Sequence, residues 1–186
     1  MRPTFVLMLS LVLPSAAGNF NVVHLAEKQD LVIEILCDQR NQAITLQPGG
    51  DSGTFTLPEK KAEFRIRDQS IEPCKVAADR AGRLIMIYRK SDKLLWHTVT
   101  SKAEKNKTSL RLINLTTQDV SLSMKDKTIE LAAGKDHDAG VFDSLNLSVS
   151  LNGQKKQSVK VEEPTAWVGI IYPTDAGPKL QFVADR

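Results

Sequence analysis

Asp136, His137 and Asp138 are the clearest candidate metal ligands, because they bring two carboxylates and an imidazole into one short segment. Oxygen and nitrogen ligands of this kind suit several divalent ions. However, consecutive side chains cannot all face one ion, and a closed site needs further ligands that the sequence does not reveal. A solvated turn is the favoured interpretation, so we expect no metal and no other cofactor.

Ser52 lies in a second candidate site, because the Gly-Asp-Ser-Gly segment at 50–53 resembles the nucleophile loop of chymotrypsin-like serine proteases. A catalytic triad brings Ser, His and an acid together in space. Only His24 precedes Ser52, Thr54 replaces a further glycine of that family, and the preceding chain is too short for a first barrel. We therefore predict a turn and no catalytic residue. For His24 and His97, a sheet-surface or hydrogen-bonded core position is favoured over a ligand role.

Trp96 and Trp167 are the candidate ligand contacts, because an exposed indole can stack on a sugar ring. Each stands at the end of an apolar run, Leu-Leu-Trp for Trp96 and Ala-Trp-Val for Trp167. Packing in a core or between domains is the usual role of tryptophan in that context. Packing is the favoured interpretation, and sugar stacking is the alternative.

Cys37 and Cys74 are the only cysteines, and a pair of this kind in an exported protein predicts one disulfide. Cys37 continues the inward face of a predicted strand at 31–37, and Cys74 shares a face with Val76. A disulfide closing this loop is worth about 4 kcal/mol in the chain-entropy model. The alternative is two buried thiols that act as small hydrophobic side chains.

The composition of the 186 residues is that of an ordinary globular protein, with 41% hydrophobic and 25% charged residues. The 25 Lys and Arg against 22 Asp and Glu leave a formal charge of only +3, and aromatic residues make up 5%. A near-balanced charge with few aromatic residues argues against a nucleic-acid partner. The length allows one average domain or two small ones, and it excludes a full α/β barrel.

The first 18 residues are typical of a secretory signal peptide. Arg2 supplies a positive start, residues 5–13 are apolar apart from Ser10, and small residues follow at 15–18. The apolar stretch is much shorter than the roughly 20 residues that cross a bilayer, and no later segment approaches that length. We therefore expect an exported protein, periplasmic or extracellular, without a membrane span.

The rest of the chain aligns with itself, which predicts a tandem repeat. We accordingly expect a signal peptide at 1–18, one repeat at 19–101, a polar linker at 102–108 and a second repeat at 109–186. Eight blocks match in the same order: 21–25 with 111–115, 29–31 with 118–120, 44–46 with 129–131, Gly49 with Gly134, 51–55 with 138–142, 75–76 with 160–161, 86–88 with 170–172, and 93–96 with 179–182.

Short strands are predicted in both repeats. Apolar and polar residues alternate at 120–124, 147–151 and 64–67, and turn residues such as Asn152-Gly153 separate the apolar runs. No long window outside the leader shows a helical period. Strands at intervals of about 8 to 12 residues favour an all-β fold, with a β-sandwich or a partly open barrel in each repeat.

The segments 110–115, 129–134 and 170–172 are similar to exported bacterial tandem immunoglobulin-like repeats of uncharacterised function. The resemblance implies two immunoglobulin-like β-sandwiches. It implies no active site, because strand and turn residues of this kind specify packing.

The leading hypothesis is a non-catalytic exported protein with a binding or structural role at the cell envelope, where its partner is a protein or a glycan. A carbohydrate-binding module is the first alternative, which depends on an exposed Trp96 or Trp167. A hydrolase or metal-dependent enzyme is the second alternative, which depends on polar groups that converge in a pocket.

Overall fold

The computed structural model describes residues 18–26, 28–37, 41–57, 61–77, 82–100, 108–124, 127–141, 146–154, 157–160 and 166–185. The fold is all-β: within these ranges every regular element is a strand, from β1 to β16. The described residues contain no helix that is long and apolar enough to cross a membrane. The predicted signal peptide and linker lie outside these ranges, apart from Gly18 and Thr108 at their ends.

The first half of the molecule, residues 18–100, is a sandwich of two four-stranded sheets. Its inner sheet has the order β4-β1-β7-β8, with β1 parallel to β7, and its outer sheet has the order β3-β2-β5-β6. The strands are β1 (Gly18–His24), β2 (Leu31–Leu36), β3 (Asn41–Leu46), β4 (Phe55–Leu57), β5 (Lys61–Ile66), β6 (Cys74–Ala77), β7 (Arg83–Lys90) and β8 (Lys93–Thr100).

The second half, residues 108–185, has the same arrangement strand by strand. Its inner sheet has the order β12-β9-β15-β16, with β9 parallel to β15, and its outer sheet has the order β11-β10-β13-β14. The strands are β9 (Ser109–Asn114), β10 (Val120–Met124), β11 (Lys127–Leu131), β12 (Asp136–Val141), β13 (Asn146–Leu151), β14 (Gln157–Lys160), β15 (Ala166–Thr174) and β16 (Gly177–Asp185).

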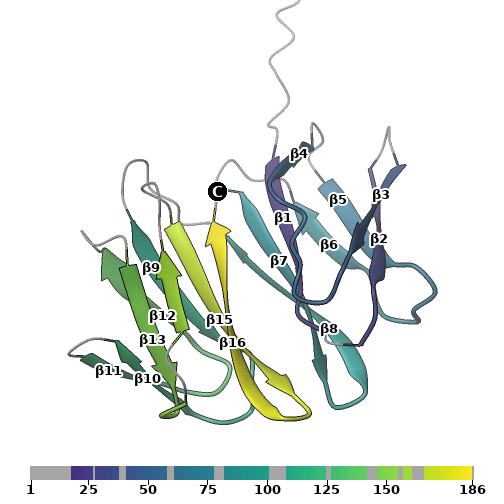
Figure 1. Cartoon of the computed structure of the whole chain (residues 1–186). Coiled ribbons are helices and arrows are strands. Elements are labelled where there is room, and N and C mark those ends of the chain that lie inside the picture. Colours follow the sequence, from purple (N-terminus) through teal and green to yellow (C-terminus); the bar gives the residue numbers. More distant parts are fainter. Residues whose placement is uncertain are drawn as a thin grey trace, which may run out of the picture.

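The four sheets form four layers, with the two inner sheets against each other in the middle of the molecule (Figure 1). Among the described residues, three hydrophobic cores lie between successive layers, one inside each sandwich and one between the two inner sheets. The inner strands are therefore buried on both faces, which explains the continuous apolar runs of β7 and β15. The outer strands are buried on one face, and β2, β5 and β10 show the predicted alternation.

The strand order corrects the immunoglobulin-like part of the fold prediction. An immunoglobulin domain joins its first, second, fourth and fifth strands in one sheet. Here β1 lies between β4 and β7, while β2 lies between β3 and β5. Each half is thus a β-sandwich, but with a different topology.

The predicted disulfide is wrong, because Cys37 and Cys74 are not joined in the structure. Cys37 directly follows β2, Cys74 begins β6, and β5 lies between these two strands. Two strand spacings separate the chains by about 9.6 Å, whereas a disulfide requires Cα atoms within about 7 Å. Burial raises the pKa of the Cys74 thiol to about 11, so this cysteine is a protonated core side chain.

The strand pairings refine the predicted self-alignment. Val23 bridges to Asp51, and its counterpart Ile113 pairs with Asp136, so Asp51 corresponds to Asp136 and not to Asp138. The sequence alignment matched the two Asp-x-Gly turns, at 51–53 and 138–140, and was therefore displaced by two residues from the strand pairing. In the second half that turn forms a bulge in β12 after Asp138. Gly49 and Gly134 do correspond, and both have positive φ in a turn.

Candidate functional site at the junction of the two halves

The core between the inner sheets joins the two halves, and we call it the junction core. Both halves contribute to it, and most of its side chains are almost fully buried. Its buried members are Val23, Leu25, Leu84, Met86 and Val99 from the first half, and Ile113, Leu115, Val168, Ile170, Tyr172 and Val183 from the second. The two halves therefore share this core, in addition to the core inside each sandwich.

His24 ends β1 beside the junction core and is fully buried. Its Nε2 lies 2.8 Å from the carbonyl oxygen of Gln29, and the backbone N–H of Ala26 donates to Nδ1 at 3.2 Å. This pattern requires the neutral ring with its proton on Nε2. Burial lowers the pKa of His24, in agreement with that state. The predicted structural role is confirmed, and both ring nitrogens are occupied.

Asn114 occupies the corresponding position at the end of β9 and makes the same two contacts. Its Nδ2 donates to the carbonyl of Gln118 at 2.8 Å, and the N–H of Thr116 donates to its Oδ1 at 3.0 Å. In each half a buried side chain thus donates to one backbone carbonyl of this loop and accepts from one backbone N–H. Both side chains provide hydrogen-bond partners for backbone N–H and C=O groups that would otherwise be buried without one.

Ser52 also has a structural role, in the turn before β4. The N–H of Val22 donates to its hydroxyl oxygen at 2.9 Å, and the hydroxyl donates to the carbonyl of Gly53 at 2.7 Å. His24 is the only histidine that precedes Ser52 in the sequence, and both of its ring nitrogens are engaged elsewhere. The contacts of Ser52 fit the turn predicted for it.

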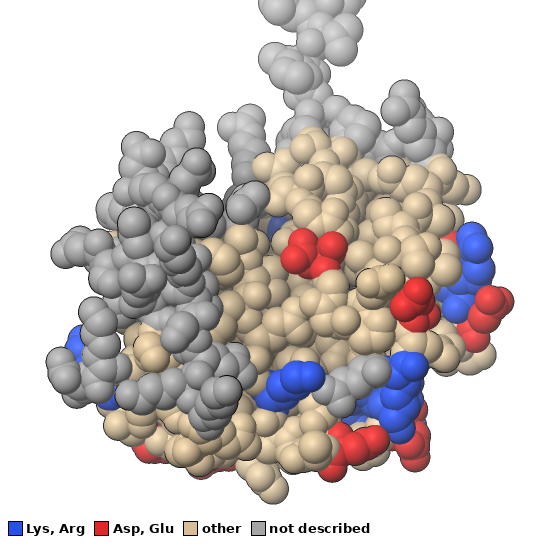
Figure 2. Space-filling view, in the orientation of Figure 1, with Lys and Arg blue, Asp and Glu red and all other residues tan. Residues whose placement is uncertain are grey.

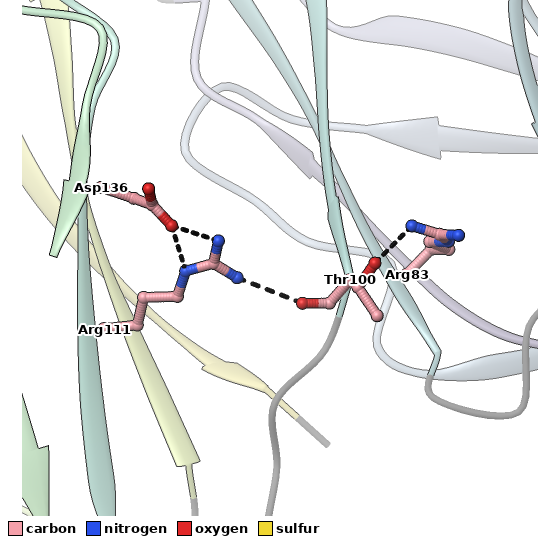
Figure 3. A network of polar contacts seen from close by, with 4 residues as sticks. All are labelled: Arg83, Thr100, Arg111 and Asp136. Carbon is pink, nitrogen blue, oxygen red and sulfur yellow. Dashed lines mark hydrogen bonds and ion pairs between the residues drawn. The ribbon is translucent and has the colours of Figure 1, made fainter. Parts of the chain in front are cut away.

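A polar network spans one edge of the junction (Figure 3). Arg111 on β9 donates from Nε to a carboxylate oxygen of Asp136 at 2.9 Å, and its Nη2 contacts the same oxygen. Its Nη1 donates to the carbonyl of Thr100, which is in the other half, at 3.1 Å. Arg83 contacts the hydroxyl of Thr100. We call these four residues the polar clamp, since one guanidinium links the two inner sheets.

The structure places the candidate metal-ligand segment beside the polar clamp. Asp136, His137 and Asp138 lie on the exposed edge strand β12 and not in a turn, and Asp136 is paired with Arg111. Alternation along a strand directs His137 away from its two neighbours. Among the described residues, no group of three His, Cys, Asp or Glu side chains could hold a metal ion.

The charges of the polar clamp affect the pKa of His97 on β8. Burial and the positive charge of Arg111 lower its pKa, while Asp136 acts in the opposite direction. His97 is therefore biased toward the neutral ring.

Two contacts hold the opposite edge of the junction. Gln181 on β16 donates from Nε2 to the carbonyl of Gly49 at 2.7 Å, and Lys28 pairs with Asp175 at 3.2 Å. Both cross between the halves. The Lys28–Asp175 pair is highly exposed and contributes little stability. The hydrogen bond of Gln181 is also exposed, and it joins β16 to the turn at Gly49.

Two concavities adjoin each other along this second edge, and together we call them the junction groove. The first has a volume of about 210 Å³ and includes Leu25, Lys28, Arg89 and Asp175. The second has a volume of about 450 Å³ and includes Leu25, Tyr172 and Gln181. Leu25 is common to both, and each concavity takes residues from both halves.

The junction groove is lined by both apolar and charged side chains. Leu25 is almost fully buried, whereas Lys28 and Asp175 lie at the exposed rim. Arg89 donates from Nη1 to the carbonyl of Asp92 at 3.1 Å, and its buried Nε has no partner among the described residues. On the molecular face seen in Figure 2, basic and acidic side chains are interspersed.

Neither tryptophan lines the junction groove. Trp96 packs against the core of the first sandwich and donates from Nε1 to the carbonyl of Glu72 at 3.0 Å. Trp167 packs against the core of the second sandwich, with a buried Nε1 that has no partner among the described residues. These contacts fit packing, the favoured interpretation, and sugar stacking by either indole remains the untested alternative.

Sequence inspection missed the groove residues Leu25, Arg89, Tyr172 and Gln181 as a group. They are far apart in the chain and become neighbours only when the inner sheets pack together. The alignment of His24 with Asn114 and of Gln29 with Gln118 was the one available signal that these loops are built alike.

Comparison with known proteins finds no matching family model and no matching curated protein. Among solved structures, the chain is similar to CBMbc, a family CBM26 module from Eubacterium rectale Amy13K, solved in complex with maltoheptaose. The TM-score is 0.27 at 11% sequence identity, over 89% of this chain and 95% of that chain. A likeness of this size carries no argument about a ligand.

Proposed function

We propose that this chain is a non-catalytic, exported binding protein of the cell envelope, built from two related repeats at 19–101 and 109–186, and that its ligand occupies the junction groove. The observation that carries the proposal is that two concavities, sharing Leu25, are formed jointly by both halves. Ligand sites occur preferentially at such domain interfaces.

The contacts of the catalytic candidates support the non-catalytic part. The hydroxyl of Ser52 and both ring nitrogens of His24 are engaged in turn and loop hydrogen bonds. Asp136 is engaged by Arg111. Each of these polar groups bonds to a neighbouring backbone group or to an opposite charge, which is a structural role.

The lining of the groove favours an acidic peptide segment as the ligand. Lys28, Arg89 and Lys179 are cationic, whereas Asp175 is the acidic residue among the lining side chains. The guanidinium of Arg89 keeps donors beyond the one that contacts Asp92, and guanidinium donors match carboxylates. A protein partner with an exposed acidic segment at the envelope would satisfy this chemistry.

Binding of a fluorescein-labelled peptide of alternating aspartate and serine, followed by anisotropy, tests the proposal. We expect Arg89→Gln to weaken binding at least tenfold, because a charge-assisted hydrogen bond contributes about 1.5–3 kcal/mol. Lys127→Gln on the distant strand β11 is the matched control and should leave binding unchanged. Equal binding of a peptide in which asparagine replaces aspartate, or equal loss in both variants, contradicts the proposal.

A soluble oligosaccharide mixture in the same assay tests the glycan alternative. Binding that is lost on Trp96→Phe or Trp167→Phe, and is unaffected by Arg89→Gln, would favour the carbohydrate-binding alternative instead.

A further inference from the structure

The strand β3 forms one edge of the outer sheet of the first half. All six of its residues pair in register with β2, from Asn41 opposite Leu36 to Leu46 opposite Leu31. Among the described strands, β2 is its only partner. Alternate backbone N–H and C=O groups on the far side of β3 therefore point away from the sheet and can accept another strand.

Edge strands usually carry a feature that prevents pairing with another chain, such as charge, proline, a bulge or short length. The other seven edge strands among the described residues each carry such a feature. β4, β6 and β14 are only three or four residues long, and β12 contains a bulge. β8 carries Lys93, β11 carries Lys127 and Glu130, and β16 carries Pro178 and Lys179.

The β3 sequence, Asn-Gln-Ala-Ile-Thr-Leu, contains none of these features. It has no charge, no proline and no glycine, and its pairing with β2 is continuous. The contrast with β11 is informative, because β11 holds the same place in the second half and carries both Lys127 and Glu130. The unprotected edge is thus particular to the first half.

The side chains of β3 show how a further strand would fit. Ile44 pairs with the buried Ile33 and packs against the core of the first sandwich, yet it stays partly exposed at the edge. Ala43 and Thr45 face the opposite side and are exposed. A strand added beside β3 would cover Ile44 and continue the buried face of the sheet.

We propose that β3 pairs antiparallel with β3 of a second copy of this chain, about a two-fold axis at Ile44. This register places Ala43 opposite Thr45 and Gln42 opposite Leu46, so residues of the same face meet across the axis. A one-residue slip would set inward side chains against outward ones. An uncharged strand meets its own copy without like-charge repulsion, which is why a second copy is the occupant.

The expected dimer is weak and concentration-dependent. A contact limited to one edge strand of six residues buries less than the roughly 1,000 Å² typical of a stable interface. The proposal is independent of ligand binding in the junction groove, since β3 is on the outer sheet and lines neither concavity.

Cysteine cross-linking of the full chain tests the register. In a background with Cys37→Ser and Cys74→Ala, Ile44→Cys places two thiols opposite each other on the axis, with Cβ atoms about 4.5–5.5 Å apart. Mild oxidation should give a covalent dimer. Ile129→Cys, at the corresponding position of β11, is the matched control and should stay monomeric. Equal cross-linking of both variants, or none in Ile44→Cys, would overturn the proposal.

Sedimentation equilibrium over a wide concentration range tests the association without engineered thiols. Ala43→Lys combined with Thr45→Lys sets like charges directly opposite each other across the axis, and should raise the dimer dissociation constant at least tenfold. Ala43 lies opposite Glu34 within its own sheet, so a lysine there is compatible with folding. Thr128→Lys with Glu130→Lys on β11 is the control. A monomeric parent chain at every concentration, or equal effects of the two double variants, refutes the proposal.

Discussion

The junction core makes a strong prediction about cooperativity, which Ile170→Ala tests. Ile170 is fully buried among side chains from both halves, whereas its neighbour Ile171 is fully buried in the core of the second sandwich. If the junction core couples the halves, loss of Ile170 must destabilise the first half as well as the second.

The size of the effect follows from the burial of Ile170. The substitution removes three carbons from a fully buried site, at about 0.8 kcal/mol for each buried CH₂ group, so the transfer loss is about 2.4 kcal/mol. The cavity left between two tightly packed sheets adds to this loss. We expect the free energy of unfolding to fall by about 3–4 kcal/mol.

The two tryptophans allow each half to be followed separately during urea unfolding. With Trp167→Phe, the remaining emission reports on the first half through Trp96, and with Trp96→Phe it reports on the second half through Trp167. We expect coincident transitions in both single-tryptophan proteins, and a shift of both transitions when Ile170→Ala is added. Ile171→Ala is the matched control for loss of the same side chain from a core inside one sandwich.

One result would refute this reasoning. If Ile170→Ala lowers the midpoint reported by Trp167 and leaves that reported by Trp96 unchanged, the halves unfold independently and the junction core does not couple them. Independent halves would also show two separate midpoints before any core substitution is made.

Three further outcomes are expected. After denaturation without reductant, alkylation should add two groups per chain by mass spectrometry, because Cys37 and Cys74 form no disulfide; an unchanged mass contradicts the structure. Gly169→Ala should lower the free energy of unfolding by about 1–3 kcal/mol and shift the urea midpoint down, since its Cβ would lie 2.9 Å from a side-chain carbon of Leu112. An unchanged midpoint argues against this packing. Stability should fall as pH drops below about 6.5, because the unfolded chain binds a proton that buried His24 rejects. His24→Asn should reduce that pH dependence in urea titrations, and an unaltered pH profile would exclude His24 as its source.

Local features of the fold could be predicted because they depend on neighbouring residues. Alternation in β2 and β10 gave the correct buried faces, since side chains of a strand point to opposite sides in turn. Gly49 and Gly134 were recognised as turn residues, and each adopts the positive φ that glycine tolerates.

Two of the predictions that failed required knowledge of which strands are neighbours. Cys37 and Cys74 were placed correctly near the inward faces of strands, but β5 separates those strands. Asp136, His137 and Asp138 were interpreted as a turn, whereas Arg111 and the pairing with β9 hold them in an edge strand. In both cases the deciding contact comes from a residue distant in the sequence.

The amino-acid sequence by itself indicated the all-β class, strand faces and turns, because hydrophobic period and glycine position act over a few residues. Tertiary structure alone decided the strand order, the shared junction core and the groove that includes Leu25. These depend on packing two inner sheets that are apolar on both faces, and strand alternation carries no information about which surface will cover a buried face.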